Sequence, residues 1–201
     1  RIGLAFVMVV GLGLVSACDT AEERAEEHYQ AGMALLEEGD VDRALVEFRN
    51  VFELNGQHEG ARLAYARVQL ERGQNAAAYG QYLRLVEQYP DNLEGRRALA
   101  EMAVAARNWE EAERHVSRAV VLDPNDTLIQ SIDNSVRYFH ALRDEDKPAQ
   151  EAAIVKAQAL VEQDKSLMTA RQVMLDDLLR KQDWYAALAV IDEGLEQEPD
   201  N

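Results

Sequence analysis

The sequence is poor in the residues that build cross-linked or β-rich domains. Its 201 residues include one cysteine and four prolines, and 6% of them are aromatic. A single cysteine rules out an intrachain disulfide framework, and the four histidines are too far apart along the chain for a local metal motif. No run of alternating β-branched residues bounded by turn signals is present, so no strand is predicted. We therefore expect neither a disulfide-stabilised fold nor a metal or other cofactor.

Basic residues are also few. The chain has 21 Lys and Arg against 37 Asp and Glu, a formal net charge of −16 at pH 7. Such a surface repels phosphate backbones and anionic lipid headgroups, so nucleic acid is not an expected partner. The simplest interpretation of the charge is solubility, with acidic residues covering exposed helical faces.

The abundant residues favour helices. Leu, Ala, Glu, Gln and Arg are common, and all of them are good helix formers. Hydrophobic residues make up 47% of the chain, which is enough to build a core. The composition therefore predicts an all-α fold.

The first residues have the pattern of an export signal. Residues 2–15 are uncharged and mostly apolar. This stretch is shorter than the roughly 20 residues that a membrane-spanning helix needs, and it is typical of the apolar region of a signal peptide. We predict a signal peptide over residues 1–17. Because Arg1 is not a methionine, we also expect the natural chain to begin a few residues earlier.

Leu14-Val15-Ser16-Ala17-Cys18 resembles the lipobox of bacterial lipoproteins: an aliphatic residue, small residues and then the cysteine that is acylated. The resemblance implies that Cys18 becomes the first residue of the mature protein and carries acyl chains, with residues 18–24 as a short tether. It also implies a lipid-anchored protein of the cell envelope that faces the periplasm. The alternative is an uncleaved signal anchor with a buried, inert cysteine. Asp19 resembles an inner-membrane retention signal, but the choice between inner and outer membrane stays open.

Residues from 25 onward repeat with a period of 34. Small residues recur at Ala44, Ala78 and Ala112 and at Gly32, Ala66 and Ala100, and larger apolar residues recur at Phe48, Tyr82 and Val116. This period and pattern resemble the tetratricopeptide repeat (TPR). The resemblance implies a right-handed superhelix of antiparallel helix pairs, a TPR helix-turn-helix solenoid. The predicted repeats, about five, span 25–58, 59–92, 93–126, a degenerate long fourth repeat at 127–167, and 168–201, and the array is expected to continue.

Helix boundary signals fall at the same period. Gly39 and Gly73 are predicted to end the first helices of their repeats, because glycine adopts the left-handed backbone conformation of a helix end at the lowest energetic cost. Thr20 with Glu23 forms a capping-box pattern before the first helix. Further predicted caps are Asp40, Asn108 and Asp183, and Pro90 and Pro124 are predicted to end second helices.

Two details of the later repeats can be predicted from the same alignment. Ala187 follows Ala112 by 75 residues, which leaves seven residues more than two periods. We place this insertion near Arg143–Pro148, as a charged linker between two helices. Trp109 and Trp184 occupy the same repeat position, and we predict that both pack in the core.

No catalytic constellation can be identified. Adjacent acidic residues such as Glu110 and Glu111 do not face each other on a helix, and no nucleophile lies beside a base in the pattern. We therefore expect a binding protein, not an enzyme, and no small-molecule substrate.

The TPR resemblance implies a concave groove, lined by the first helix of each repeat, that holds a protein or peptide partner. The groove stripe is apolar with two arginines on an acidic protein, which suits a partner with apolar anchors and a carboxylate. The alternative is that Tyr29, Met33 and Leu63 only pack within the fold. The predicted groove residues are Tyr29, Met33 and Leu36, then Leu63, Arg67 and Leu70, then Arg97 and Glu101.

Lipobox and repeat together resemble TPR lipoproteins that act as assembly factors of the bacterial envelope. Among these the sequence is most similar to the exopolysaccharide-export type. Four alternatives stay open: a lipoprotein of pilus or secretion-system assembly, one of outer-membrane assembly, a periplasmic holdase, and the docking arm of an enzyme whose catalytic domain lies beyond residue 201.

Overall fold

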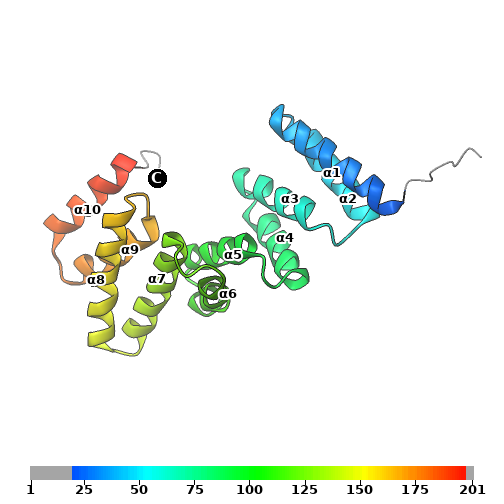
Figure 1. Cartoon of the computed structure of the whole chain (residues 1–201). Coiled ribbons are helices and arrows are strands. Elements are labelled where there is room, and N and C mark those ends of the chain that lie inside the picture. The colour runs from blue at the N-terminus through cyan, green and yellow to red at the C-terminus, as the bar shows by residue number, and fades with distance from the viewer. Residues whose placement is uncertain (1–19, 198–201) are drawn as a thin grey trace, which may run out of the picture. The chain divides into compact units, whose positions relative to one another are not determined.

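The computed structural model describes residues 20–197, and within this range the only regular elements are α-helices (Figure 1). The signal peptide predicted over residues 1–17, Cys18 and Asp19 lie outside the described residues. By their internal contacts the helices divide into two units, one ending at His58 and one beginning at Glu59. The ten helices are α1 (Ala21–Glu37), α2 (Val41–Leu54), α3 (Glu59–Glu71), α4 (Asn75–Gln88), α5 (Leu93–Ala105), α6 (Trp109–Leu122), α7 (Thr127–Arg143), α8 (Lys147–Gln163), α9 (Met168–Arg180) and α10 (Trp184–Gln197). None of these described helices is both long enough and apolar enough to cross a membrane.

The first unit is the helix pair α1 and α2. Thr20 opens α1 with the predicted capping box, since its hydroxyl accepts from the Glu23 backbone and the Glu23 carboxylate accepts from the Thr20 N–H. Gly32 allows the two helices to approach, because it lies directly against the fully buried ring of Phe48. Gly32 and Phe48 are therefore closely packed positions within this helix pair.

The second unit consists of four further helix pairs. In each pair the first helix packs on the second, and each second helix that is followed by another pair also contacts the first helix of that pair. First helices also contact one another, α5 with α7 and α7 with α9. The core between the pairs is formed by the repeat positions seen in the sequence, with Tyr82 and Val116 almost fully buried and Ala66, Ala78, Ala100 and Ala112 fully buried. The second unit is therefore a series of two-helix repeats, each of which buries its apolar face on the next.

Each repeat turns between its helices through one backbone motif. The second residue after the first helix has a positive φ, and the backbone N–H of the following residue donates to a carbonyl five residues earlier, as Asp40 does to Leu35 at 2.8 Å. This is the Schellman motif, which favours glycine because the left-handed region crowds a Cβ. The positive-φ residues are Gly39 (79°), Gly73 (70°), Arg107 (55°), Glu145 (56°) and Gln182 (60°). The two glycine predictions are confirmed, and three turns adopt the same motif without glycine.

The predicted linker near Arg143–Pro148 is wrong. Helix α7 is four residues longer than α5 (17 against 13), and α8 is three residues longer than α6 (17 against 14), which accounts for all seven inserted residues. Only Asp144–Asp146 separate α7 from α8, and Pro148 lies in the first turn of α8. Proline is tolerated there because the N–H that it lacks has no helical partner at that position. The insertion extends helices and leaves the turn unchanged.

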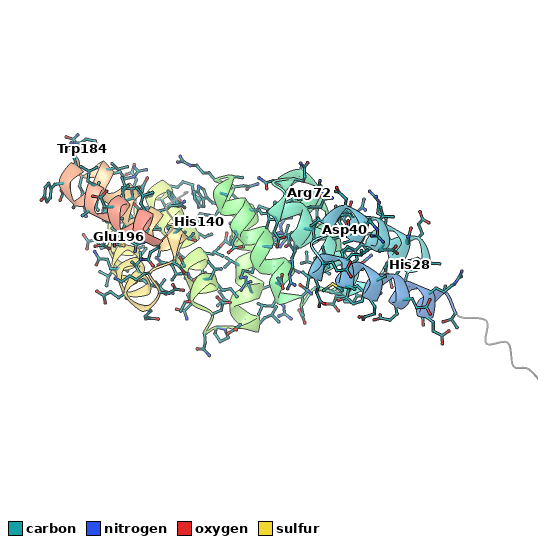
Figure 2. The ribbon with its side chains drawn as sticks, turned by 90° about the horizontal axis from the view of Figure 1, so that it is seen from above. His28, Asp40, Arg72, His140, Trp184 and Glu196 are labelled. Atoms are coloured by element: carbon teal, nitrogen blue, oxygen red, sulfur yellow. The ribbon has the colours of Figure 1, made fainter. Side chains whose placement is uncertain are left out.

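The two tryptophans, predicted to have the same role, differ. Trp109 is half-buried, packs against the core of the second unit and stacks on Phe139 of α7, with ring centroids 4.0 Å apart and planes 13° apart. Trp184 is 61% exposed and projects from α10 (Figure 2), so the prediction that it packs in the core is wrong. The reason is that the partner of Trp109 comes from the first helix of the following repeat, and no helix follows α10 within residues 20–197.

Candidate functional site

The first helices of the third, fourth and fifth repeats, α5, α7 and α9, enclose a pocket of about 300 Å³ together with the start of α6. We call it the aromatic pocket. Apolar side chains predominate in it, as is usual for sites that bind a partner side chain or a small ligand. It is lined by Val104, Ala105, Arg107, Trp109, Phe139, Gln172, Leu175, Asp176 and Leu179.

Stacked rings form one wall of the aromatic pocket. Trp109 begins α6, where the Asn108 side chain caps the helix by accepting from the Glu111 N–H at 3.3 Å. The cap fixes the start of the helix, and the stack with Phe139 fixes the indole. Phe139 also contacts Tyr138, edge-on with centroids 5.1 Å apart. This wall is a rigid apolar surface that loses little entropy when a partner binds.

The opposite wall comes from α9. Leu175 and Leu179 are four residues apart, so they lie on one face of the helix, and Leu179 is 42% exposed. Asp176 lies between them in the sequence, but its carboxylate is already bound: Oδ2 accepts from the Tyr138 hydroxyl at 2.8 Å and from Arg180 Nε at 2.5 Å. Burial, and then this hydrogen bond, raise the pKa of Tyr138, which keeps the phenol protonated as a donor. The α9 wall therefore offers mainly apolar surface.

Arg107 provides the positive charge of the aromatic pocket. It is exposed in the α5–α6 turn, at the left-handed position of that turn, and lines the pocket. Within residues 20–197 its guanidinium has no hydrogen bond or ion pair. Apolar walls beside an unpaired guanidinium suit an aromatic or aliphatic side chain that is accompanied by a carboxylate.

The groove residues predicted in the first unit are half-buried. Tyr29 packs within its own unit, with its ring centroid 6.3 Å from that of Phe48 and 4.7 Å from that of His58. Met33 and Leu36 are partly exposed on the same helix. Packing and partner contact are both compatible with these exposures, and the groove across the first helices of both units stays a prediction.

The arginines predicted to line the groove in the second unit are already paired. Both N–H groups on one edge of Arg67 donate to the two carboxylate oxygens of Glu94, and Arg97 donates to Asp126 at 3.4 Å. Each pair links the first helix of one repeat to the start of the next repeat's first helix. A partner carboxylate would have to displace an internal one at either place, so these arginines are less available than Arg107.

Two of the three remaining predicted groove residues line a second cavity of the same unit. Leu63 and Leu70 are half-buried and pack against the core around Tyr82. Leu70 and Glu101 also line a cavity of about 640 Å³ between the second and third repeats. The structure thus brings Leu70 and Glu101 to one place.

The sequence predictions missed the aromatic pocket. Phe139 lies within the lengthened α7, and the pocket residues of α9 follow the seven-residue insertion, so the 34-residue period does not place them in register. The intra-repeat turns offer a better reference: Arg67 and Glu101 lie six residues before Gly73 and Arg107. Counting back six from the turns at 145 and 182 gives Phe139 and Asp176, both in the pocket. The seventeen-residue length of α7 hides this register in the sequence.

Comparison with known proteins supports the fold. Residues 35–91 match the family described as Tetratricopeptide repeat, and no curated protein matches the chain. Among solved structures the chain is similar to YrrB, described as "a TPR protein with an unusual peptide-binding site" (20% identity, TM-score 0.63, 88% of each chain covered). It is also similar to PilF of Pseudomonas aeruginosa (19% identity, TM-score 0.56, 90% of this chain and 79% of that chain). A third similar structure is TTC0263, a thermophilic TPR protein of Thermus thermophilus (22% identity, TM-score 0.55, 88% of this chain and 93% of that chain covered). These likenesses concern the fold, and they confirm the prediction of an all-α chain of about five TPR helix pairs.

Proposed function

We propose that this chain, which has the tetratricopeptide-repeat fold, is a membrane-anchored scaffold that binds a protein or peptide partner during assembly of the cell envelope. Exopolysaccharide export is the pathway that we propose first, on the resemblance of its leader and repeats to lipoproteins of that type. The fold supports a binding role, as does the peptide-binding site named for the similar protein YrrB. The leader sequence through Cys18 supports the anchor.

The aromatic pocket carries the proposal. Its stacked Trp109 and Phe139 are preorganised, and aromatic side chains, Trp above all, are over-represented among residues that dominate binding energy. Leu179 is exposed at the pocket and the nearby Arg107 is unpaired. The partner segment that fits best has an aromatic or aliphatic residue next to an acidic one.

The test is crosslinking of the full-length protein in native membranes, followed by mass spectrometry of the captured proteins. Leu179→Glu places a charge in the aromatic pocket at a side chain that is 42% exposed, so the fold should tolerate it. The matched control is Val155→Glu on α8, because Val155 is 65% exposed and lines neither cavity. We expect one dominant envelope protein at fixed stoichiometry that is lost with Leu179→Glu and kept with Val155→Glu. Equal capture by both variants would exclude the aromatic pocket as the binding site.

The anchor can be tested separately. Cys18→Ser removes the only cysteine, so incorporation of an alkyne-labelled fatty acid should stop and the protein should leave the membrane fraction. Retention of the Cys18→Ser protein in membranes at the wild-type level would contradict lipid anchoring. The outcome does not depend on which partner the pocket binds.

A holdase is the second candidate, because α10 carries an exposed apolar stripe. Trp184, Leu188, Ile191 and Leu195 recur at helical spacing on one face, and all four are exposed. Exposed apolar surface of this kind marks either a site that binds other chains or the face on which a further repeat of the array packs. A diffuse set of unfolded clients in the crosslinking experiment, insensitive to Leu179→Glu, would favour the holdase over the scaffold.

A further inference from the structure

A second cavity shares one lining residue, Ala105, with the aromatic pocket. It has a volume of about 640 Å³ and is bounded by the ends of α3 and α5 and the starts of α4 and α6. Leu70, Tyr79 and Met102 give it apolar walls together with several alanines. Its only charged lining residues are Glu101 and Glu111. We call it the acidic cavity.

The carboxylate of Glu111 is fully occupied by its neighbours. Oε1 accepts from the Tyr79 hydroxyl at 2.9 Å and lies 3.0 Å from Nε2 of His115, and Oε2 pairs with Arg114 at 3.1 Å. Arg96 donates to Nδ1 of the buried His115 at 3.2 Å, which leaves Nε2 to donate to Glu111. Glu111 is therefore a fixed structural group and has little capacity for a ligand.

Glu101 differs from Glu111 in having no hydrogen-bonded or ion-paired partner within the described residues. Its carboxylate makes no hydrogen bond or ion pair within residues 20–197, although the residue is half-buried. Arg97, which carries the nearby opposite charge, donates its hydrogen bond to Asp126 instead. Burial raises the pKa of Glu101, Arg97 partly opposes the shift, and Asp126 adds to it. A half-buried carboxylate without a hydrogen bond or ion pair lowers the stability of the fold. Destabilising groups of this kind are typical of functional sites, where they serve binding.

We propose that the acidic cavity receives a lysine or arginine side chain of the protein partner, with its cationic group bound to the Glu101 carboxylate. The apolar stem of such a side chain would lie along Leu70 and Met102, as long basic side chains do when they cross apolar surface. Charge complementarity selects this occupant, because the cavity has acidic lining residues and no basic one. Among the predicted groove residues, Glu101 is therefore the one that can bind a basic group of the partner. Arg67 and Arg97 are already paired with Glu94 and Asp126.

The acidic cavity and the aromatic pocket define a pattern for the partner. Ala105 lines both, and residues of the α5–α6 turn line each of them: Ala106 and Asn108 the acidic cavity, Arg107 the aromatic pocket. One partner segment that crosses the turn would place a basic side chain on one side and an apolar residue with an acid on the other. This pattern rests on the proposed protein-binding function, but the acidic cavity can be tested without the natural partner.

The probe is the blocked pentapeptide acetyl-Gly-Leu-Arg-Leu-Gly-amide, compared with the same peptide carrying citrulline, the neutral isostere of arginine. The full chain is labelled with ¹³C-methyl methionine. It has only five methionines, and the Met102 signal is assigned by Met102→Leu. We expect the arginine peptide to shift the Met102 signal and to bind about five- to tenfold more tightly than the citrulline peptide, since charge-assisted hydrogen bonds are roughly twice as strong as neutral ones.

Glu101→Gln should abolish the preference for arginine, and Glu87→Gln should leave it unchanged, because Glu87 is exposed on α4 and lines neither cavity. Equal affinities for the two peptides, or a preference that survives Glu101→Gln, would overturn the proposal. These results are independent of the crosslinking experiment, so loss of the acidic-cavity proposal and loss of the scaffold proposal are distinguishable.

Discussion

The same substitution, glycine to alanine, should have opposite effects at two helical positions of this chain. A Cβ on Gly32 would lie 2.6 Å from Cε1 and 2.9 Å from Cδ1 of Phe48, closer than real Cβ contacts. Phe48 is fully buried and cannot swing into solvent. Gly80, in the middle of α4, has nothing within 4 Å of the corresponding Cβ position. Both glycines therefore have a helical backbone, and they differ in whether a neighbouring side chain occupies the position of the new Cβ.

The magnitudes follow from two opposing terms. Replacing glycine by alanine inside a helix stabilises by roughly 0.5–1 kcal/mol, whereas overpacking a closed core costs typically about 1–3 kcal/mol. Gly80→Ala should therefore raise the free energy of unfolding by about 0.5–1 kcal/mol. Gly32→Ala should lower it by about 1 kcal/mol, the central difference between the two terms.

Hydrogen exchange of the α1 and α4 amides measures each effect in its own unit, so the assay does not require the whole chain to unfold in one step. Urea denaturation followed by circular dichroism supplies the global comparison. The double variant Gly32→Ala/Phe48→Leu should recover part of the loss, because the smaller side chain makes room for the new methyl group. Wild-type or higher protection of α1 in Gly32→Ala would refute the packing argument.

Other predictions concern the turns and Glu101. Glu145→Gly should raise the free energy of unfolding by about 0.5–1 kcal/mol, because Glu145 has a φ of 56°, a conformation that glycine adopts more easily. Glu151→Gly, inside α8, should lower the free energy of unfolding by a similar amount, because glycine weakens a helix. Urea denaturation measures both changes. Glu101→Gln should raise the melting temperature at pH 7, because the raised pKa of Glu101 means that its ionised form destabilises the fold. The gain should shrink as the pH falls through the pKa of folded Glu101, where the wild-type carboxyl becomes protonated and resembles the amide. A gain that stays constant as the pH falls from neutral to below that pKa would contradict this reasoning.

The sequence predicts those features that depend on neighbours close along the chain. The Thr20–Glu23 capping box involves residues three apart, and Gly39 and Gly73 report a local backbone conformation. The 34-residue period predicts the buried positions such as Ala78 and Ala112, because the repeats of the second unit pack on one another in the same way. Local rules and repetition together were enough for the fold class and for the buried repeat positions.

Features that depend on a specific partner far along the chain were not predicted. The Arg67–Glu94 pair joins residues 27 apart, and neither residue type at either position signals the pairing. The exposure of Trp184 depends on whether another helix covers it, which its own position in the repeat does not reveal. The lengthening of α7 and α8 was assigned to a linker because charged residues and a proline mark a turn and a helix start equally well.

The pairs Arg67–Glu94 and Arg97–Asp126 have a consequence for how the second unit unfolds. Each connects one repeat to its neighbour and is partly exposed, so salt weakens it while leaving the apolar core of each repeat intact. In a linear array, stability within a repeat and coupling between nearest neighbours are separate quantities, and the coupling sets how many repeats unfold together. Ionic strength should therefore act mainly on the coupling: the second unit should unfold over a broader range of denaturant at high salt, as its repeats become more independent.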